Sequence, residues 1–234
     1  MIIEFVGLPG VGKTTISKLV NKKLIEKGCQ AEYVPAGQLW KINNNNELIK
    51  LILVSWLIYP KRSFKLYNVF IDFYKEVTLD RKHSIKQYLN RGSFMKTLTW
   101  NKYLINYNKM RNRAYKNKIF ILDRGLLQSI LGIKLKHELG KKQLLYLRSF
   151  YNENCSDVTV FMKASCEIIN KHRKIRNASE VKVEVEQMIL FEKFCEIIAD
   201  KNLNKAKLVV QNNQPKSQVA YQVINHVVMQ KDKH

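Results

Sequence analysis

The sequence is poor in acidic residues and in cysteine, and each shortage indicates what kind of protein this is. Lys and Arg number 41 against 19 Asp and Glu, so the formal net charge is +22. Such an excess predicts an anionic partner (a nucleotide, a nucleic acid or an acidic lipid), although a solvated lysine-rich surface accounts for part of it. The four cysteines, Cys29, Cys155, Cys166 and Cys195, have neither zinc-ligand nor disulfide-framework spacing. We expect free thiols.

The sequence also lacks a long hydrophobic run. Its longest apolar stretch, residues 51–59, is too short to span a bilayer, and no charged segment followed by an apolar one marks a secretory signal. We therefore expect a cytoplasmic protein. With 46% hydrophobic residues over 234 positions, the chain is predicted to form one α/β domain, residues 1–234, with room for one large insertion.

A phosphate-binding motif stands near the N-terminus. Residues 7–15 read GLPGVGKTT, which fits the P-loop pattern G-x-x-x-x-G-K-[ST]. An apolar, strand-like run precedes the motif, and apolar residues at helical spacing follow it as far as Leu24, with Gly28 placed to end the helix. Strand, glycine-rich loop and helix are the context that the motif requires, which favours it over a chance glycine-rich turn.

The residue types of this loop match the chemistry of a bound nucleotide. Glycines let backbone N–H groups approach phosphate oxygens, and the helix that begins near Lys13 directs its positive end to the same place. The motif predicts that Lys13 reaches the β- and γ-phosphates of ATP and that the Thr14 hydroxyl ligates Mg²⁺. The residues predicted to bind nucleotide here are Gly7, Pro9, Gly10, Val11, Gly12, Lys13, Thr14 and Thr15.

A second motif lies at residues 118–125, KIFILDRG. Four apolar residues predict a buried strand, and Asp123 stands at its carboxyl end, where ligands bind in open α/β sheets. There Asp123 is expected to hold Mg²⁺ through water or to accept the proton of an attacking hydroxyl. The alternative is that Asp123 caps the following helix and that Arg124 is a surface residue.

The region between these motifs, residues 47–118, predicts a helical insertion between the second and third strands, with breaks at residues 60–63 and near Arg91 and Gly92. Residues 61–118 carry fifteen Lys or Arg against three acids, with aromatic residues interleaved. Amphipathic helices with an aromatic core explain this pattern better than an anion-binding surface does. If the insertion does bind an anionic acceptor, Arg111 and Arg113 are the first candidates.

Strands are predicted at residues 30–34, 158–162 and 207–211 as well. Helices are predicted at 126–139, 143–154, from an N-cap at Ser165 through Arg176, at 180–200 and at 217–229. This alternation predicts a three-layer α/β/α fold with a five-stranded, mainly parallel sheet.

Residues 7–15, the pair Asp123 and Arg124, and more weakly residues 173–176 resemble the P-loop nucleoside and nucleotide kinases, thymidylate-kinase-like in outline. The resemblance implies that Arg124 binds the acceptor side. It also implies that Arg173 and Arg176 form an arginine lid around residues 171–180, and that the loop carrying Asn213 and Pro215 packs against adenine. The acid that such kinases often carry after the second strand is missing from residues 35–38, PAGQ.

These features predict an ATP- and Mg²⁺-dependent phosphotransferase whose catalytic residues are Lys13, Asp123, Arg124, Arg173 and Arg176, with Thr14 and Asp123 at the metal. The acceptor is expected to resemble a nucleoside or nucleotide; a sugar, glycan or lipid-linked acceptor is the alternative. A nucleotide-regulated protein that docks on an acidic membrane or nucleic acid remains a second hypothesis. A GTPase is disfavoured because Asn-Lys-x-Asp is missing.

Overall fold

The computed structural model describes residues 1–78, 85–114, 117–134, 145, 149, 151, 153–154, 156–175, 185–198 and 206–231. The chain divides into two compact units. The first contains Met1–Ala36, Met110–Leu135 and Leu147–His234, and the second contains Gly37–Lys109 and Lys136–Tyr146. The sheet and both sequence motifs belong to the first unit.

The first unit is built on a five-stranded sheet in which every pairing is parallel. Its strands stand in the order β2-β3-β1-β4-β5, so the motif-bearing strands β1 and β3 are neighbours in its centre. Both are buried along their whole length, as expected for a parallel sheet covered on its two faces. The predicted α/β fold is confirmed. The strands are β1 (Ile2–Val6), β2 (Ala31–Val34), β3 (Ile119–Leu122), β4 (Val158–Lys163) and β5 (Ala206–Gln211).

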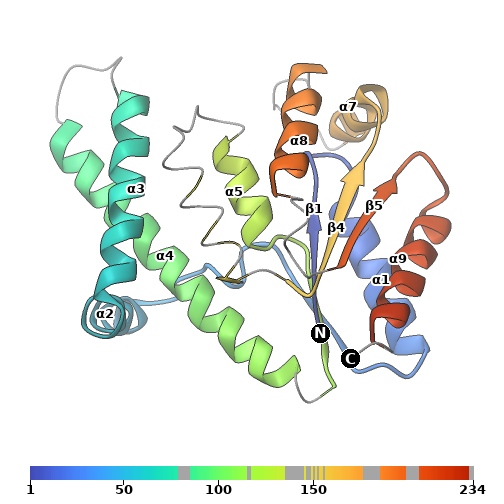
Figure 1. The fold of residues 1–234 in the computed structure, drawn as a ribbon, viewed down its shortest axis with the longest axis horizontal. Helices are drawn as coiled ribbons and strands as arrows, with labels where there is room; N and C mark the ends of the chain where they lie inside the picture. The colour runs from blue at the N-terminus through green and yellow to red at the C-terminus, as the bar shows by residue number, and fades with distance from the viewer. Residues whose placement is uncertain are drawn as a thin grey trace. The chain divides into compact units, whose positions relative to one another are not determined.

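Helices cover this sheet. α1 (Lys13–Glu26) and α9 (Lys216–Lys231) lie together on one side of the strands, and α5 (Leu126–Lys134) lies on the other, against β1 (Figure 1). α1 ends as predicted at Gly28, whose φ of 78° lets the Cys29 amide donate to the Leu24 carbonyl at 2.9 Å. α7 (Cys166–Ile175) begins with the predicted cap, because the Ile168 amide donates to Ser165 Oγ at 3.4 Å; α8 is Val185–Ile198.

In its described residues the second unit consists mainly of helices, as predicted for the insertion. It contains α2 (Asn45–Leu53), the π-helix η1 (Val54–Ile58), α3 (Pro60–Thr78) and most of α4 (Ile85–Ala114). The predicted break after the first helix is present, but it falls at Tyr59, between η1 and α3. Pro60 is the first residue of α3, a position where its missing N–H costs nothing, so residues 60–63 form a helical turn and are not the break itself. The break expected near Arg91 and Gly92 is wrong. α4 continues through Arg91 and Gly92, because an interior glycine costs only about 1 kcal/mol.

Aromatic rings form the core of the second unit. Trp40 stacks on Tyr103 at 4.3 Å between ring centroids, and its ring meets Trp100 edge-on at 5.7 Å. Tyr103 is fully buried, whereas Lys61 and Lys96 are exposed. The amphipathic interpretation is thus confirmed for these residues. The unit begins at Gly37, ahead of its first helix, and Trp40 belongs to its core.

Two expectations about the chain as a whole concern membranes and thiols. Among the helices in the described part of the chain, none has the length and apolarity that crossing a membrane requires. Cys29 and Cys166 are free thiols, as predicted.

We predict that Tyr103→Ala strongly destabilises the second unit. Truncating a buried aromatic residue typically costs about 3–5 kcal/mol, through lost burial and the cavity that remains. All three tryptophans, Trp40, Trp56 and Trp100, lie in residues 37–109. Tryptophan fluorescence during denaturant unfolding therefore reports on this unit. The control is Tyr59→Ala, since Tyr59 is 39% exposed. Coincident midpoints for the two variants would contradict the aromatic core.

Candidate active site

The predicted P-loop connects β1 to α1 and has the expected backbone. Gly10 and Gly12 adopt φ values of 90° and 95°, which L-residues rarely adopt. α1 begins at Lys13 directly after Gly12, and Gly12 makes no side-chain cap. The first-turn amides of α1 therefore point toward the loop, which is the arrangement that binds phosphate at helix N-termini.

The glycines also make room for neighbouring elements. A Cβ at Gly10 would lie 2.9 Å from Arg173 Cγ and 3.0 Å from the Ile169 carbonyl oxygen, both in α7. His172 of the same helix places Nδ1 3.0 Å from the Gly10 carbonyl oxygen. The structure thus brings Arg173 against the P-loop. Its predicted partner in the arginine lid, Arg176, lies outside the described residues.

Thr14 and Asp123, the two residues predicted to share a metal ion, meet. Thr14 Oγ1 lies 3.0 Å from both Oδ1 and Oδ2 of Asp123, which is 6% exposed. A third side chain, Tyr33 of β2, donates its hydroxyl to Asp123 Oδ2 at 3.1 Å. Burial raises the pKa of Tyr33 to about 12, and the charge of Asp123 adds to this shift. Tyr33 therefore stays protonated and donates to the carboxylate at neutral pH.

The donor set at this point suits Mg²⁺. This ion takes oxygen ligands, typically one or two from protein side chains, with the rest from water and substrate phosphates. The Thr14 hydroxyl and the Asp123 carboxylate are oxygen donors that already converge to 3.0 Å at the N-terminus of α1. We infer that these two residues fit the predicted metal.

The Lys13 side chain extends back over the start of the loop. Its Nζ donates to the carbonyl oxygens of Gly7 at 2.8 Å and Leu8 at 3.0 Å. The ammonium group is therefore held within the P-loop, and its contact with phosphates stays a prediction. Asn212, the residue after β5, holds the other end of the loop: its Nδ2 donates to the Val11 carbonyl at 2.6 Å.

A buried carboxyl group lies in β1, the strand that leads into the P-loop. Glu4, in the middle of β1, is fully buried and accepts hydrogen bonds from the Gln128 amide at 3.0 Å and from Ser156 Oγ at 2.9 Å. Burial raises the pKa of Glu4 to about 7, although these hydrogen bonds and one from the Leu127 amide oppose the shift. The Gln128 side chain in turn accepts the Gly7 amide at 2.9 Å.

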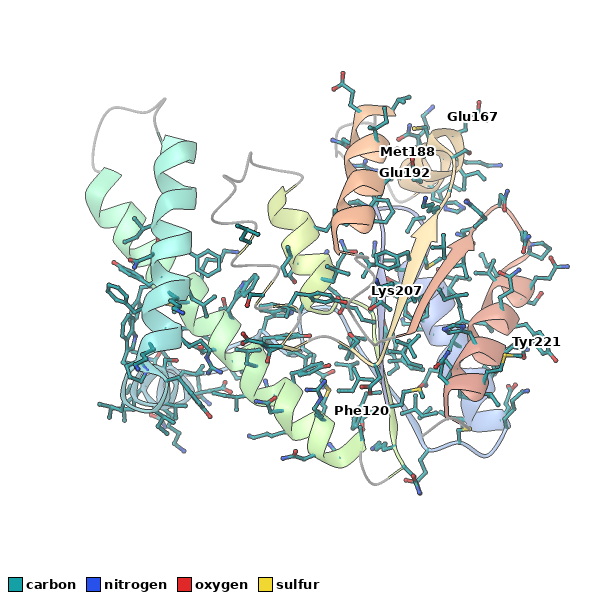
Figure 2. The ribbon with its side chains drawn as sticks, in the orientation of Figure 1. Phe120, Glu167, Met188, Glu192, Lys207 and Tyr221 are labelled. Atoms are coloured by element: carbon teal, nitrogen blue, oxygen red, sulfur yellow. The ribbon has the colours of Figure 1, made fainter. Side chains whose placement is uncertain are left out.

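An apolar recess lies between the P-loop and the helices α7 and α8. Met188 and Glu192 lie on the side of α8 that faces α7 (Figure 2). Lys163 Nζ and Glu192 Oε1 form an ion pair at 3.0 Å at its rim. α7 and α8 are therefore seated beside the loop. The recess is lined by Leu8, Val11, Met162, Ala164, Ile169, Met188 and Phe191, with Lys163 and Glu192.

Other predicted site residues are not brought into contact with the P-loop. Arg124 follows Asp123 directly and is exposed, so its role with an acceptor stays a prediction. Asn213 and Pro215 are exposed, and the Pro215 carbonyl accepts the amides of Gln218 and Val219 at the start of α9. The contact of this loop with the P-loop comes from the neighbouring residue Asn212.

Sequence reasoning missed five residues of this region. Glu4 carried a signal, since it is the one acid in an apolar strand. Asn212 stands next to the predicted Asn213, and His172 lies within the predicted lid. Tyr33 and Gln128 are ordinary residues of a strand and a helix, and nothing in the local sequence distinguishes them.

Comparison with known proteins supports the fold. No protein-family model matches the sequence, and no curated protein matches it either. A solved structure of deoxyadenosine kinase from M. mycoides with bound dATP has a TM-score of 0.51 and 19% identity, over 97% of this chain and 100% of that one. The same enzyme with bound dCTP has a TM-score of 0.47 and 19% identity, over 98% and 100%. The likeness with a TM-score of 0.51 shows that this chain shares its fold with that deoxyadenosine kinase.

We predict that Gly12→Ala destabilises the protein more than Gly28→Ala does. Both positions have positive φ, so both variants bear backbone strain of about 1–2 kcal/mol. A Cβ at Gly12 would lie 2.6 Å from Asn212 Nδ2, whereas no described atom lies within 4 Å of one at Gly28. Displacing the buried Asn212 amide should cost about 1–3 kcal/mol more. Denaturant unfolding measures the free energy of unfolding of both variants. Equal losses would show that the Asn212 side chain moves aside without a loss of stability.

Proposed function

We propose that this protein is a phosphotransferase that moves the γ-phosphoryl group of ATP to an acceptor, with Mg²⁺. One observation carries the proposal. The P-loop threonine and the acid at the end of β3 converge, with Thr14 Oγ1 3.0 Å from both oxygens of Asp123. A P-loop hydroxyl beside a strand-end carboxylate is the arrangement that holds the metal of a nucleoside triphosphate.

We infer that the acceptor is a nucleoside or a close analogue of one. The fold likeness to deoxyadenosine kinase from M. mycoides, at a TM-score of 0.51, supports this class over a sugar or a lipid-linked acceptor. Arg124, exposed beside Asp123, is the residue that we propose for the acceptor side. The acceptor class extends beyond the fold, and turnover with a panel of acceptors tests it.

The acid that the resembling kinases often carry after the second strand is missing here. Another residue would therefore have to deprotonate the acceptor. Glu32, inside β2, is engaged elsewhere: its Oε2 lies 2.6 Å from Lys118 Nζ and 3.8 Å from Arg113 Nη2. Asp123 is therefore our candidate for orienting the acceptor hydroxyl or the metal. The tyrosine donating to its Oδ2 holds the carboxylate in one orientation.

The other proposed site residues would stabilise the negative charge of the phosphates. Backbone amides of the P-loop and of the first turn of α1 would bind phosphate oxygens, and Lys13 would stabilise the charge that develops during transfer. Arg173, beside Gly10, would approach the same phosphates. Thr14 and Asp123 are the residues that would hold Mg²⁺, which would neutralise negative charge on the phosphates.

The basic helical unit remains a candidate for acceptor binding. The hypothesis that residues 61–118 bind an anionic acceptor stays a prediction, as does contact with acidic membrane or nucleic acid. Arg113 is a weaker candidate than the sequence suggested. Its guanidinium pairs with Glu32 and lies 5.5 Å from the centroid of Phe120, near the amino end of β3, whereas Asp123 follows the carboxyl end.

The decisive experiment is a panel of acceptors. ADP release is measured for the purified protein with ATP, Mg²⁺ and, in turn, deoxynucleosides, ribonucleosides, nucleoside monophosphates, sugars and glycolipid precursors. Mass spectrometry identifies any phosphorylated product. We expect turnover with a nucleoside. Tight ATP binding without any product would contradict the kinase and favour a nucleotide-regulated binding protein.

We predict that Lys13→Ala removes phosphoryl transfer and leaves the fold intact. The ammonium donates to the loop carbonyls of Gly7 and Leu8 and belongs to a loop and not to the apolar core, so the free energy of unfolding should change by about 1 kcal/mol or less. Turnover should fall by about 100-fold or more, as when a charge-stabilising donor is removed. Circular dichroism checks the fold. Wild-type turnover in this variant at saturating ATP would contradict the P-loop assignment.

We predict that Asp123→Asn lowers kcat by about 100-fold and changes the Kd for ATP by less than about threefold. The amide keeps the shape of the side chain but removes the charge that orients the metal or the acceptor. Calorimetric titration with ATP and steady-state kinetics separate the two effects. A parallel loss of affinity and turnover would assign Asp123 to ATP binding alone.

A further inference from the structure

Glu4 occupies an unusual position for a carboxyl group. It lies in β1 between apolar residues, is 0% exposed, and pairs in register with Leu122 of β3 and Thr159 of β4. Burying a carboxyl is unfavourable unless its oxygens are satisfied. Both are: Oε1 accepts the Gln128 amide at 3.0 Å, and Oε2 accepts Ser156 Oγ at 2.9 Å.

The Glu4 carboxyl acts as the N-terminal cap of α5. Leu127 and Gln128, whose amides donate to it, are the second and third residues of that helix. Such amides have no partner inside a helix and are usually satisfied by the side chain of the residue just before it. Here that residue is Gly125, whose carbonyl accepts the Ser129 amide at 3.3 Å and which has no side chain. A strand residue supplies the cap instead.

Gly125 and Glu4 depend on each other. A Cβ on residue 125 would lie 2.6 Å from Oε1 and 2.7 Å from Oε2 of Glu4, closer than real Cβ contacts allow. The glycine after Asp123 and Arg124 is therefore required by the carboxyl beneath it. The position of this carboxyl in turn sets where the Asp123–Gly125 turn enters α5.

The first turn of α5 also reaches the P-loop. Gln128 Oε1 accepts the amide of Gly7, the first glycine of the loop, at 2.9 Å, and both residues are buried. Contacts thus run from Glu4 to the first turn of α5 and from there to Gly7. Asp123 is connected to the same turn through the chain, because residues 123–125 lead directly into α5. Asp123 is itself bound to Thr14.

We propose that Glu4 is a positioning residue for phosphoryl transfer: by capping α5 it holds the Gly7 amide and the Asp123 turn in the same arrangement. This inference rests on the proposed kinase activity for its catalytic readout. The geometry predicts a second readout, ATP affinity, because the start of the P-loop is held through Gln128 whether or not an acceptor is phosphorylated.

The test compares two Glu4 variants, which differ in the hydrogen-bond acceptors that they offer to the first turn of α5, with one control variant. Glu4→Leu removes both acceptor oxygens at similar size, whereas Glu4→Gln keeps one acceptor for the Gln128 amide. The control is Thr159→Val, which removes a buried hydrogen bond to Tyr151 from the residue opposite Glu4 on β4. Unfolding midpoints, the Kd for ATP, kcat and KM are measured for each at a temperature where it is folded.

We expect Glu4→Leu to lower kcat by about 10- to 100-fold, since a displacement near 1 Å in an active site has effects of that size. The Kd for ATP should rise by about tenfold, and Glu4→Gln should recover most of both losses. Thr159→Val should lose stability while keeping kcat and Kd near wild type. Wild-type kcat and Kd in folded Glu4→Leu overturn the proposal, as do equal losses in Thr159→Val.

A second comparison covers the case in which Glu4→Leu does not fold. Gly125→Ala should weaken ATP binding and lower kcat in the wild-type background, because its Cβ collides with the Glu4 carboxyl. In Glu4→Ala the collision is removed, so adding Gly125→Ala should cause little further loss. If the losses in kcat and ATP affinity of the two single variants multiply in the double variant, Glu4 and Gly125 act independently and the coupling is contradicted.

The outcomes also separate this inference from the proposed function. If the wild-type protein binds ATP but phosphorylates no acceptor, the proposed function fails, and the Kd comparison alone supports or overturns the role of Glu4. If phosphorylation occurs and the Glu4 variants match wild type in kcat and Kd, the positioning role fails and the kinase assignment stands.

Discussion

The parallel register between β1 and β3 is the constraint on which the site depends. Ile2 pairs with Phe120 and Glu4 with Leu122, so the carboxyl ends of the two strands lie at the same end of the sheet. The P-loop follows one strand and Asp123 the other, and for that reason Thr14 reaches the carboxylate. A slip of one residue would displace Asp123 by about 3.3 Å and turn every side chain of the strand to the opposite face. Strands that are apolar on both faces specify register weakly; in β1, the one charged residue must face α5 to be satisfied.

The sequence predicted the parts of the site that are local. Residues 7–15 and 118–125 each carry a strand, its end and the functional side chain within a few positions, so pattern and structure coincide. The contacts that it did not predict join distant positions: Tyr33 with Asp123 across 90 residues, and Gln128 with Gly7 across 121. These side chains are common types in ordinary places, and only the sheet order brings them to the motifs.

The same distinction explains where the helical unit differs from the prediction. The helices and their aromatic core follow from spacing along the chain. Their ends depended on Pro60 and Gly92, whose effects are decided by position and by tertiary packing. Proline is favourable at the first position of a helix, and the cost of one glycine is small beside the packing of the 30-residue α4. Trp40 lies near the start of the unit at Gly37, and its partners Trp100 and Tyr103 lie some 60 residues farther along.

The bond from Asn212 to Val11 spans 201 positions, and it has a consequence for synthesis on the ribosome. β1 is synthesised well before its neighbours, because β3 begins only at residue 119 and β4 at residue 158. The final support of the P-loop arrives still later, with β5. At about 5–20 residues per second, the central strand waits several seconds or longer for its first partner. A nascent chain therefore completes this loop only after Asn212 has left the ribosome, and shorter fragments lack the bond that holds Val11.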